Sequence, residues 1–236
     1  MKKLFAIVLS AAALLMGTHA NAQLSFGAGW LNSTERSYTG NNTPDKYNYN
    51  GFYAGGQFNI LIADDLGIAP GLYASMLFGK ADGSASEAGV TFSADAKYKE
   101  LALNIPVNIT YAFEVGDFEM FAYAGPIFQY GLMSKDTGSY SLSNLNPGFG
   151  GSVTTGDITY NEYTGVTLDK DGNKVDALST DPIRSPFNIY IGGGLGIQAG
   201  NFQVILGYAH SILNVSRVRG EKLSRSEVKL GVGYAF

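Results

Sequence analysis

The chain is 236 residues long, poor in charge and rich in glycine. Charged residues make up 15% and hydrophobic residues 45%, and there are 31 glycines, whereas an ordinary soluble domain has about 25% charged residues. The absence of cysteine excludes disulfides, thiolate metal sites and a cysteine nucleophile. A formal net charge of −4 argues against a nucleic-acid partner, which would require clustered Lys and Arg.

The first 22 residues have the layout of a secretory signal peptide. A short basic start precedes an apolar run over 4–17, which is shorter than the roughly 20 residues of a spanning helix. Ala20 and Ala22 form an Ala-x-Ala pattern. We therefore predict cleavage after Ala22, with Gln23 as the first residue of a single domain over 23–236.

Eight later segments alternate apolar residues with small or polar ones, as half-buried strands do. In one of them, Leu101 and Leu103 alternate with Ala102 and Asn104. Several of these segments have the length that crosses a bilayer as a tilted strand. The predicted strands cover 24–32, 51–62, 66–78, 98–113, 118–132, 187–198, 202–213 and 225–236.

The connections between these strands alternate in length. Long ones are expected at 34–50, 80–97, 133–185 and 214–224, and short ones at 63–66, 114–117 and around 200–201. Long loops at one end and short turns at the other are typical of outer-membrane barrels. The predicted fold is all-β: an eight-stranded antiparallel transmembrane up-and-down β-barrel in the cell outer membrane, with long extracellular loops, the third at 133–185.

The last strand looks like the carboxy-terminal assembly signal of bacterial outer-membrane barrels. Lys229, Gly231, Tyr234 and Phe236 have the spacing polar, glycine, aromatic, terminal Phe. The assembly machinery is expected to recognise such a segment by strand addition. The alternative is an ordinary edge strand that happens to end in Tyr-x-Phe.

With that strand, the chain resembles the small outer-membrane β-barrel proteins common in Bacteroidetes, often labelled "porin family" or PorT-like. The resemblance lies in 63–72, 103–109, 124–126, 207–208 with 212–214, and the closing Gly231, Gly233, Tyr234 and Phe236. Three of these pieces contain a proline, which normally weakens a strand prediction. The resemblance implies that Pro70, Pro106 and Pro126 lie in strands with bulges or irregular pairing. The segment 133–185 is longer than expected for the family's third outer loop.

An eight-stranded barrel has an interior that side chains just fill, so we expect a plugged lumen. Lys229 is expected to pair with an acidic group there, and Gly192, Gly194 and Gly196 to make room for Tyr53 or Tyr123. The polar residues expected to point inward are Gln57, Asn59, Glu100, Asn104, Asn108, Gln198, Glu227 and Lys229.

Two segments resemble a chemical site, one catalytic and one calcium-binding, but a role without chemistry is favoured for each. His210 precedes Ser211, as in a lipid esterase with a base-activated serine, but neighbours on a strand point to opposite faces. The segment 169–176 resembles the start of a calcium loop, yet Lys174 occupies the position that needs glycine, so a hairpin turn is favoured. We therefore predict no catalytic residues, no metal site and no cofactor.

The long loops are the remaining candidates for function. The segments 33–50 and 133–185 are rich in Ser, Thr, Gly, Asn and Tyr, a composition that suits adaptable recognition. A basic cluster of Arg217, Arg219, Lys222 and Arg225 is expected to contact lipopolysaccharide phosphates; a solvated face is the alternative.

The predicted function is a non-enzymatic barrel with a structural or surface-recognition role. Its expected partners are outer-membrane lipid, lipopolysaccharide and the assembly machinery, and its surface ligand is not identified by the sequence. The alternatives are a narrow porin-like diffusion channel and an outer-membrane lipid hydrolase that uses His210.

Overall fold

The computed structural model describes residues 22–40, 43–87, 90–116, 118–143, 152–154, 158–178 and 180–236. The predicted signal peptide, including Ala20, lies outside these residues apart from Ala22. Ala22 and Gln23 begin the first strand, where they pair with Ile60 and Asn59. No helix in the described ranges is long and apolar enough to cross a membrane.

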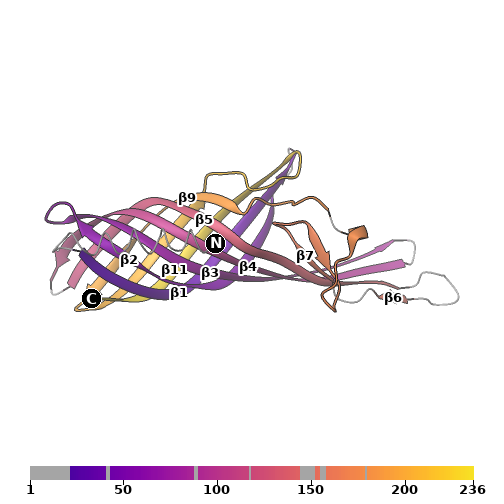
Figure 1. The fold of residues 1–236 in the computed structure, drawn as a ribbon, viewed down its shortest axis with the longest axis horizontal. Coiled ribbons are helices and arrows are strands. Elements are labelled where there is room, and N and C mark those ends of the chain that lie inside the picture. Colours follow the sequence, from indigo (N-terminus) through magenta and orange to yellow (C-terminus); the bar gives the residue numbers. More distant parts are fainter. Residues whose placement is uncertain are drawn as a thin grey trace.

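Eight antiparallel strands close into a ring, which confirms the predicted fold class. Each strand pairs with its neighbours in the order β4-β3-β2-β1-β11-β10-β9-β5, and pairing of β4 with β5 completes the circle. Figure 1 shows the ring as a barrel of tilted strands. The strands are β1 (Ala22–Thr39), β2 (Asp45–Leu61), β3 (Leu66–Glu87), β4 (Val90–Val115), β5 (Phe118–Ser143), β9 (Phe187–Ala199), β10 (Phe202–Ser211) and β11 (Glu221–Ala235).

The two faces of the wall differ in polarity, as the alternation predicts. On β4, Ile105 and Ile109 are exposed on the outside, whereas Asn104 and Asn108 are buried in the lumen. The same contrast runs round the ring and leaves a continuous outward coat, here called the apolar belt. Its members include Phe26, Trp30, Phe52, Phe78, Val107, Phe118, Phe128, Leu132, Ile191, Leu195, Phe202, Val204, Leu206, Val228, Leu230 and Val232.

At the long-loop end the strands run further than predicted. The segments 34–50 and 80–97 are not loops: β1 and β2 stay paired up to Ser37 and Asp45, and β3 and β4 pair up to Glu87 and Val90. The sequence of these parts is rich in small and polar residues and lacks the apolar alternation that identifies a strand. Figure 1 shows β3, β4 and β5 continuing past the ring towards β6.

The segment 133–185 is likewise not a simple loop. β5 continues to Ser143, and three short strands follow: β6 (Ser152–Thr154), β7 (Ile158–Asn161) and β8 (Val166–Leu168). β6 and β7 pair with the extension of β5, and β8 pairs with β7. A 3-10 turn, η1 (Asp176–Leu178), comes before the chain returns to β9.

The three strand prolines coincide with interruptions of the ladder. Pairing skips two positions between β2 and β3 beside Pro70, between β3 and β4 beside Pro106, and between β4 and β5 beside Pro126. The register is the same on both sides of each gap, so the expected irregular pairing is confirmed without a bulge at these positions. The shift in the β4–β5 register lies instead between Leu101 and Ala102.

Candidate functional site

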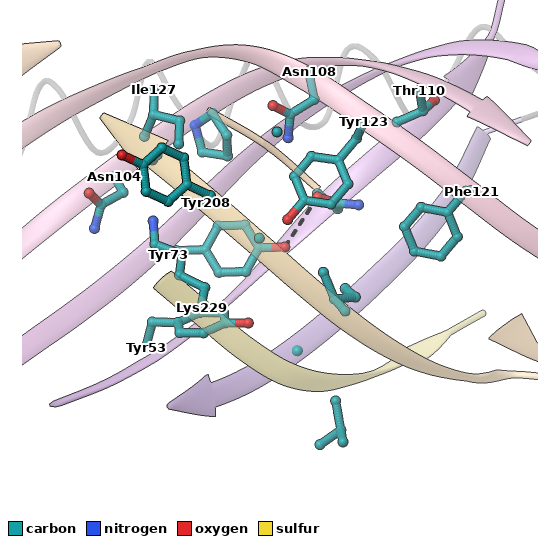
Figure 2. Close-up of a pocket in the computed structure, with 18 residues that line it drawn as sticks. Tyr53, Tyr73, Asn104, Asn108, Thr110, Phe121, Tyr123, Ile127, Tyr208 and Lys229 are labelled. Carbon is teal, nitrogen blue, oxygen red and sulfur yellow. Dashed lines mark hydrogen bonds between the residues drawn. The ribbon is translucent and has the colours of Figure 1, made fainter. Parts of the chain in front are cut away.

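Large tyrosine rings fill the middle of the lumen, and glycines on the facing strands make room for them. A Cβ on Gly231 would come within 2.2 Å of the Tyr53 hydroxyl, and one on Gly207 within 2.3 Å of the Tyr123 hydroxyl. Figure 2 shows these rings with Tyr73, whose hydroxyl donates to Gln57 Oε1 at 3.2 Å. Of the three glycines expected to make such room, Gly194 faces Tyr123, whereas Gly196 faces Phe121 and Gly192 faces Ile127.

A cavity of about 80 Å³, here called the luminal cavity, lies among these rings. It is lined on several sides by polar groups, including Gln57, Asn104, Asn108 and Lys229. Because one water needs roughly 10–15 Å³ of such space, the cavity can hold several waters. The middle of the barrel is therefore filled, as its strand number implies.

On the long-loop side of the luminal cavity, a chain of hydrogen bonds runs along the inner wall over four adjacent strands. The Tyr190 hydroxyl donates to Gln129 Oε1 at 3.2 Å, Gln129 Nε2 donates to Asn104 Oδ1 at 3.1 Å, and Asn104 Nδ2 donates to Ser75 at 2.8 Å. We call this set the amide layer. It joins β9, β5, β4 and β3 and satisfies polar groups that burial would otherwise destabilise.

The inward polar set predicted from the sequence is confirmed. Glu100, Asn104, Asn108 and Glu227 are buried, and Gln57, Asn59, Gln198 and Lys229 are half-buried. Lys229 pairs with Glu227 at 3.1 Å, so its expected acidic partner is its neighbour on the same inward face of β11.

Nearer the long-loop end, five charged side chains and one tyrosine hydroxyl converge across the lumen in what we call the ion network: Glu35, Tyr98, Glu100, Glu162, Arg184 and Arg225. Arg225 Nη1 reaches both carboxylate oxygens of Glu100 at 2.9 and 2.8 Å, and its Nη2 reaches Glu35 at 2.8 Å. Such multidentate Arg–carboxylate pairs are the strongest class of charge-assisted hydrogen bonds.

Arg184 completes the network from the other side. Its guanidinium bonds Glu35, lies 3.2 Å from Glu162, and donates to the Tyr98 hydroxyl at 2.7 Å. The Tyr98 hydroxyl in turn donates to Glu100. Glu35, Glu100, Tyr98 and both arginines are each at most 7% exposed, so the network closes the lumen at this level.

Arg225 therefore cannot contact lipopolysaccharide, and that part of the predicted basic cluster is wrong. The sequence placed position 225 at the edge of a loop, but β11 begins at Glu221. From there the odd positions 225, 227 and 229 face the lumen. Arg217, Arg219 and Lys222 are exposed at the long-loop end, and their contact with lipid phosphates stays a prediction.

Arg184 was missed by the sequence analysis, because it lies between strands and not within one. Residues 183–185, here called the strap, join the two long segments at this end. Ser185 N donates to Val215 O and Arg217 N donates to Ile183 O, both at 2.8 Å. Prolines at 182 and 186, which favour extended backbone beside them, are the only local signal.

Beyond the ion network lies a hollow of about 510 Å³, here called the vestibule. Its walls carry Lys46, Tyr47, Tyr49 and Lys80 from β2 and β3, and Asp136 from the part of β5 beyond the apolar belt. Burial, together with the neighbouring Glu162 carboxylate, raises the pKa of Asp136 to about 7. Asp136 therefore holds a proton at a pH where an ordinary carboxyl has lost it.

His210 faces outward and its partner is not Ser211. Its Nδ1 lies 3.0 Å from the Ser226 hydroxyl on β11, and the Tyr208 hydroxyl also donates to Ser226 at 3.2 Å. Ser211 points to the lumen side and accepts from Arg225 N. The cross-strand pair of His210 and Ser226 depends on strand register and could not be read from the sequence alone.

The segment 169–176 forms a turn. Asp169 Oδ1 accepts from the backbone N–H groups of Asp171 and Asn173 at 2.9 and 2.8 Å, and Leu168 bridges Lys174. These backbone hydrogen bonds lower the pKa of Asp169 because they stabilise the carboxylate. Among the residues that the structure describes, no group of three His, Cys, Asp or Glu side chains could hold a metal ion.

The proposed assembly residues divide between the two faces of β11. Tyr234 and Phe236 are exposed in the apolar belt, where their rings meet those of Phe202 and Phe26. Lys229 and Gly231 face the lumen. Phe236 N donates to Leu24 O at 2.8 Å, so the residue continues the β1–β11 pairing. Recognition by the assembly machinery stays a prediction.

The chain matches no family model and no curated protein sequence. Among solved structures it is similar to Ail, the attachment invasion locus protein of Yersinia pestis, at 15% identity and a TM-score of 0.36, covering 92% of this chain and 99% of that one. It is also similar to Neisserial surface protein A (11%, 0.33, covering 91% and 97%) and to the P. putida toluene transporter TodX (11%, 0.36, covering 94% and 91%). These identities and TM-scores are too low to assign a family or an activity.

Proposed function

We propose that this chain is a non-enzymatic outer-membrane β-barrel with a structural or surface-recognition role and a lumen closed by its own side chains. One observation carries the proposal: the closed wall is apolar outside and polar inside. In lipid every strand N–H and C=O must be satisfied within the protein, and a closed barrel achieves this. A soluble barrel would not expose Phe52, Phe202 and Val232, each more than half exposed, to water.

The filled lumen favours a closed barrel over an open diffusion channel. The tyrosine rings, the amide layer and the ion network occupy successive levels of the bore. The luminal cavity between them is only about 80 Å³. A solute larger than a few waters would have to displace buried, hydrogen-bonded side chains, which is costly.

The long-loop end is proposed to face the exterior. It carries the extensions of β3, β4 and β5 and the exposed Arg217, Arg219 and Lys222. Cationic side chains just beyond an apolar belt suit the phosphates of lipopolysaccharide. The signal peptide and the closing strand are proposed to direct export and to engage the assembly machinery.

Fractionation and conductance together test this function. We expect the mature protein in the outer membrane, released only by detergent, and we expect purified wild-type protein to leave a planar bilayer silent. Recovery from the soluble periplasm would overturn the membrane assignment. Stable wild-type openings would instead favour the narrow diffusion channel.

A lipid hydrolase is kept as a second candidate because His210 Nδ1 lies 3.0 Å from the Ser226 hydroxyl. In a serine hydrolase triad a carboxylate is hydrogen-bonded to the histidine and orients its ring. Among the described residues, no carboxylate is hydrogen-bonded to His210. A fluorophosphonate probe should therefore leave Ser226 unlabelled, with Ser226→Ala and Ser224→Ala as matched variants. Two results together would establish the hydrolase instead. The probe would label wild type and Ser224→Ala but not Ser226→Ala, and a strain that carries His210→Ala would have an altered lipid A.

A further inference from the structure

The hollows inside the barrel form a row that is interrupted at one level. The luminal cavity shares Gln57, Thr110 and Phe121 with a smaller cavity of about 30 Å³ below it. That lower cavity shares Gln23 and Asn59 with an open hollow at the short-turn end. The hollows thus adjoin one another from the short-turn end up to the luminal cavity.

The vestibule at the other end is separate, since it shares no lining residue with the luminal cavity. The ion network lies between the two. Glu35, Tyr98 and Arg184 line the floor of the vestibule, whereas Asn104 of the amide layer belongs to the wall of the luminal cavity. The row of hollows therefore ends beneath the ion network.

Within the ion network, Arg225 belongs to a strand of the barrel, whereas Arg184 does not. Glu35 on β1 and Arg225 on β11 are direct partners in the barrel ladder, and Glu100 pairs with Leu77 and Ser134. Arg184 instead lies on the strap. The strap is held by the bonds to Val215 O and from Arg217 N already described, and by Ile183 N and Arg184 N, which donate to Glu162 O at 3.1 and 3.2 Å. Lifting the strap would withdraw Arg184 without breaking the ring.

The buried guanidinium of Arg184 is not fully hydrogen-bonded. Its Nε is buried and has no hydrogen-bond partner, whereas Arg225 Nε donates to Glu35 at 3.2 Å. A buried donor without a partner destabilises the inserted position. The inserted state of Arg184 is therefore less favourable than full pairing would make it.

We propose that Arg184 is the removable stopper of a narrow passage that prefers small cations. The passage rests on the proposed function, because it requires a closed barrel that spans a membrane. With Arg184 inserted, Glu35, Glu100 and Glu162 face two guanidinium groups. When the strap lifts, the same three carboxylates face Arg225 alone, and an acidic constriction selects cations.

The rest of the bore is compatible with this preference. The lower cavity is lined by Gln23, Asn59, Gln198 and Gln203, whose side chains are uncharged amides, and by the acidic Asp65 and Glu119. Lys229 is the one cation among the residues lining the luminal cavity, and Glu227 pairs with it at 3.1 Å. The tyrosine rings limit the passage to dehydrated or partly hydrated ions.

Planar-bilayer recording of full-length mature protein tests the stopper. Wild type is expected to show no stable openings, because the strap keeps Arg184 inserted most of the time. Arg184→Ala is expected to show stable, discrete openings whose reversal potential in a KCl gradient moves towards that of potassium. Arg36→Ala is the matched control, because it removes the same charge from the outward face of β1, next to Glu35, without touching the ion network. Openings of equal frequency in Arg36→Ala, or an anion preference in Arg184→Ala, would overturn the proposal.

A second variant covers the case in which Arg184→Ala does not fold. Arg184→Ala with Glu35→Gln removes one charge of each sign and so avoids an uncompensated buried carboxylate. It should also open, with a weaker cation preference than the single variant. Folding is checked by β-sheet circular dichroism and heat-modifiable gel migration. Folded variants without stable openings refute the stopper, whereas stable openings in wild type or recovery in the soluble fraction would refute the proposed function.

Discussion

Replacing Arg225 by alanine measures how much the ion network contributes to the stability of the barrel. Breaking a buried ion pair typically costs about 3–5 kcal/mol, because the remaining charge is left uncompensated. Here Glu35 keeps its bond to Arg184, and Glu100 keeps the Tyr98 hydroxyl and Arg184 Nη1 at 3.5 Å. These remaining partners place the expected loss at the low end, at about 3 kcal/mol.

Urea unfolding of the protein in lipid vesicles, followed by tryptophan fluorescence, gives the magnitude. With a slope near 2 kcal/mol per molar urea, a loss of about 3 kcal/mol lowers the midpoint by about 1.5 M. Arg217→Ala is the control and should change the unfolding free energy by less than about 0.5 kcal/mol, as exposed substitutions do. An equally small loss in Arg225→Ala would show that water already screens the network and that the remaining carboxylates are not desolvated.

Three further outcomes are expected. Gly29→Ala places a Cβ 2.2 Å from the Leu230 carbonyl oxygen and should destabilise the barrel by about 1–3 kcal/mol in urea unfolding; Ala28→Gly, on the outward face, is the comparison, and an unchanged Gly29→Ala midpoint would contradict the close packing. Because burial raises the pKa of Asp136 to about 7, the folded state retains a proton that the unfolded chain loses near its ordinary value of 3.8. Stability should therefore fall as pH rises from about 4 to about 7, and Asp136→Asn should flatten this part of the midpoint-against-pH curve; an unaltered slope would refute it. Deletion of Phe236 should slow insertion in an assembly assay with reconstituted machinery, while Val232→Ala, also outward on β11, should insert at the wild-type rate; equal rates would remove Phe236 from the assembly signal.

The barrel could be predicted because lipid and lumen impose opposite demands on neighbouring residues. Within the apolar belt each strand must alternate, so the parity of Ile105 or Val204 settles which way a side chain faces. Beyond the belt the sequence of β3 and β4 is rich in small and polar residues. The ladder continues there without an apolar alternation in the sequence, which is why 34–50 and 80–97 were predicted as loops.

The sequence predicts which polar residues point into the lumen, but not which of them bond to each other. Parity alone places Glu100, Asn104 and Glu227 inside. The partners of Glu100 come from β11 and from the strap, and their meeting depends on barrel closure and on the return of a long segment. Neither condition leaves a local pattern, so Arg184 was missed and Arg225 was assigned to the surface.

The prolines of β3, β4 and β5 give the barrel wall a seam. Pro70 and Val107 are paired, and the shared register would set Val107 opposite Pro126, so the skipped pairs follow one another across three successive strand interfaces. Apart from the register shift between Leu101 and Ala102, pairing elsewhere in the belt is continuous, and a lipid environment offers no substitute for a missing bond. Backbone amides flanking this seam should therefore exchange with solvent deuterium before those of β9 to β11, and the wall would first loosen on the side opposite the closing strand.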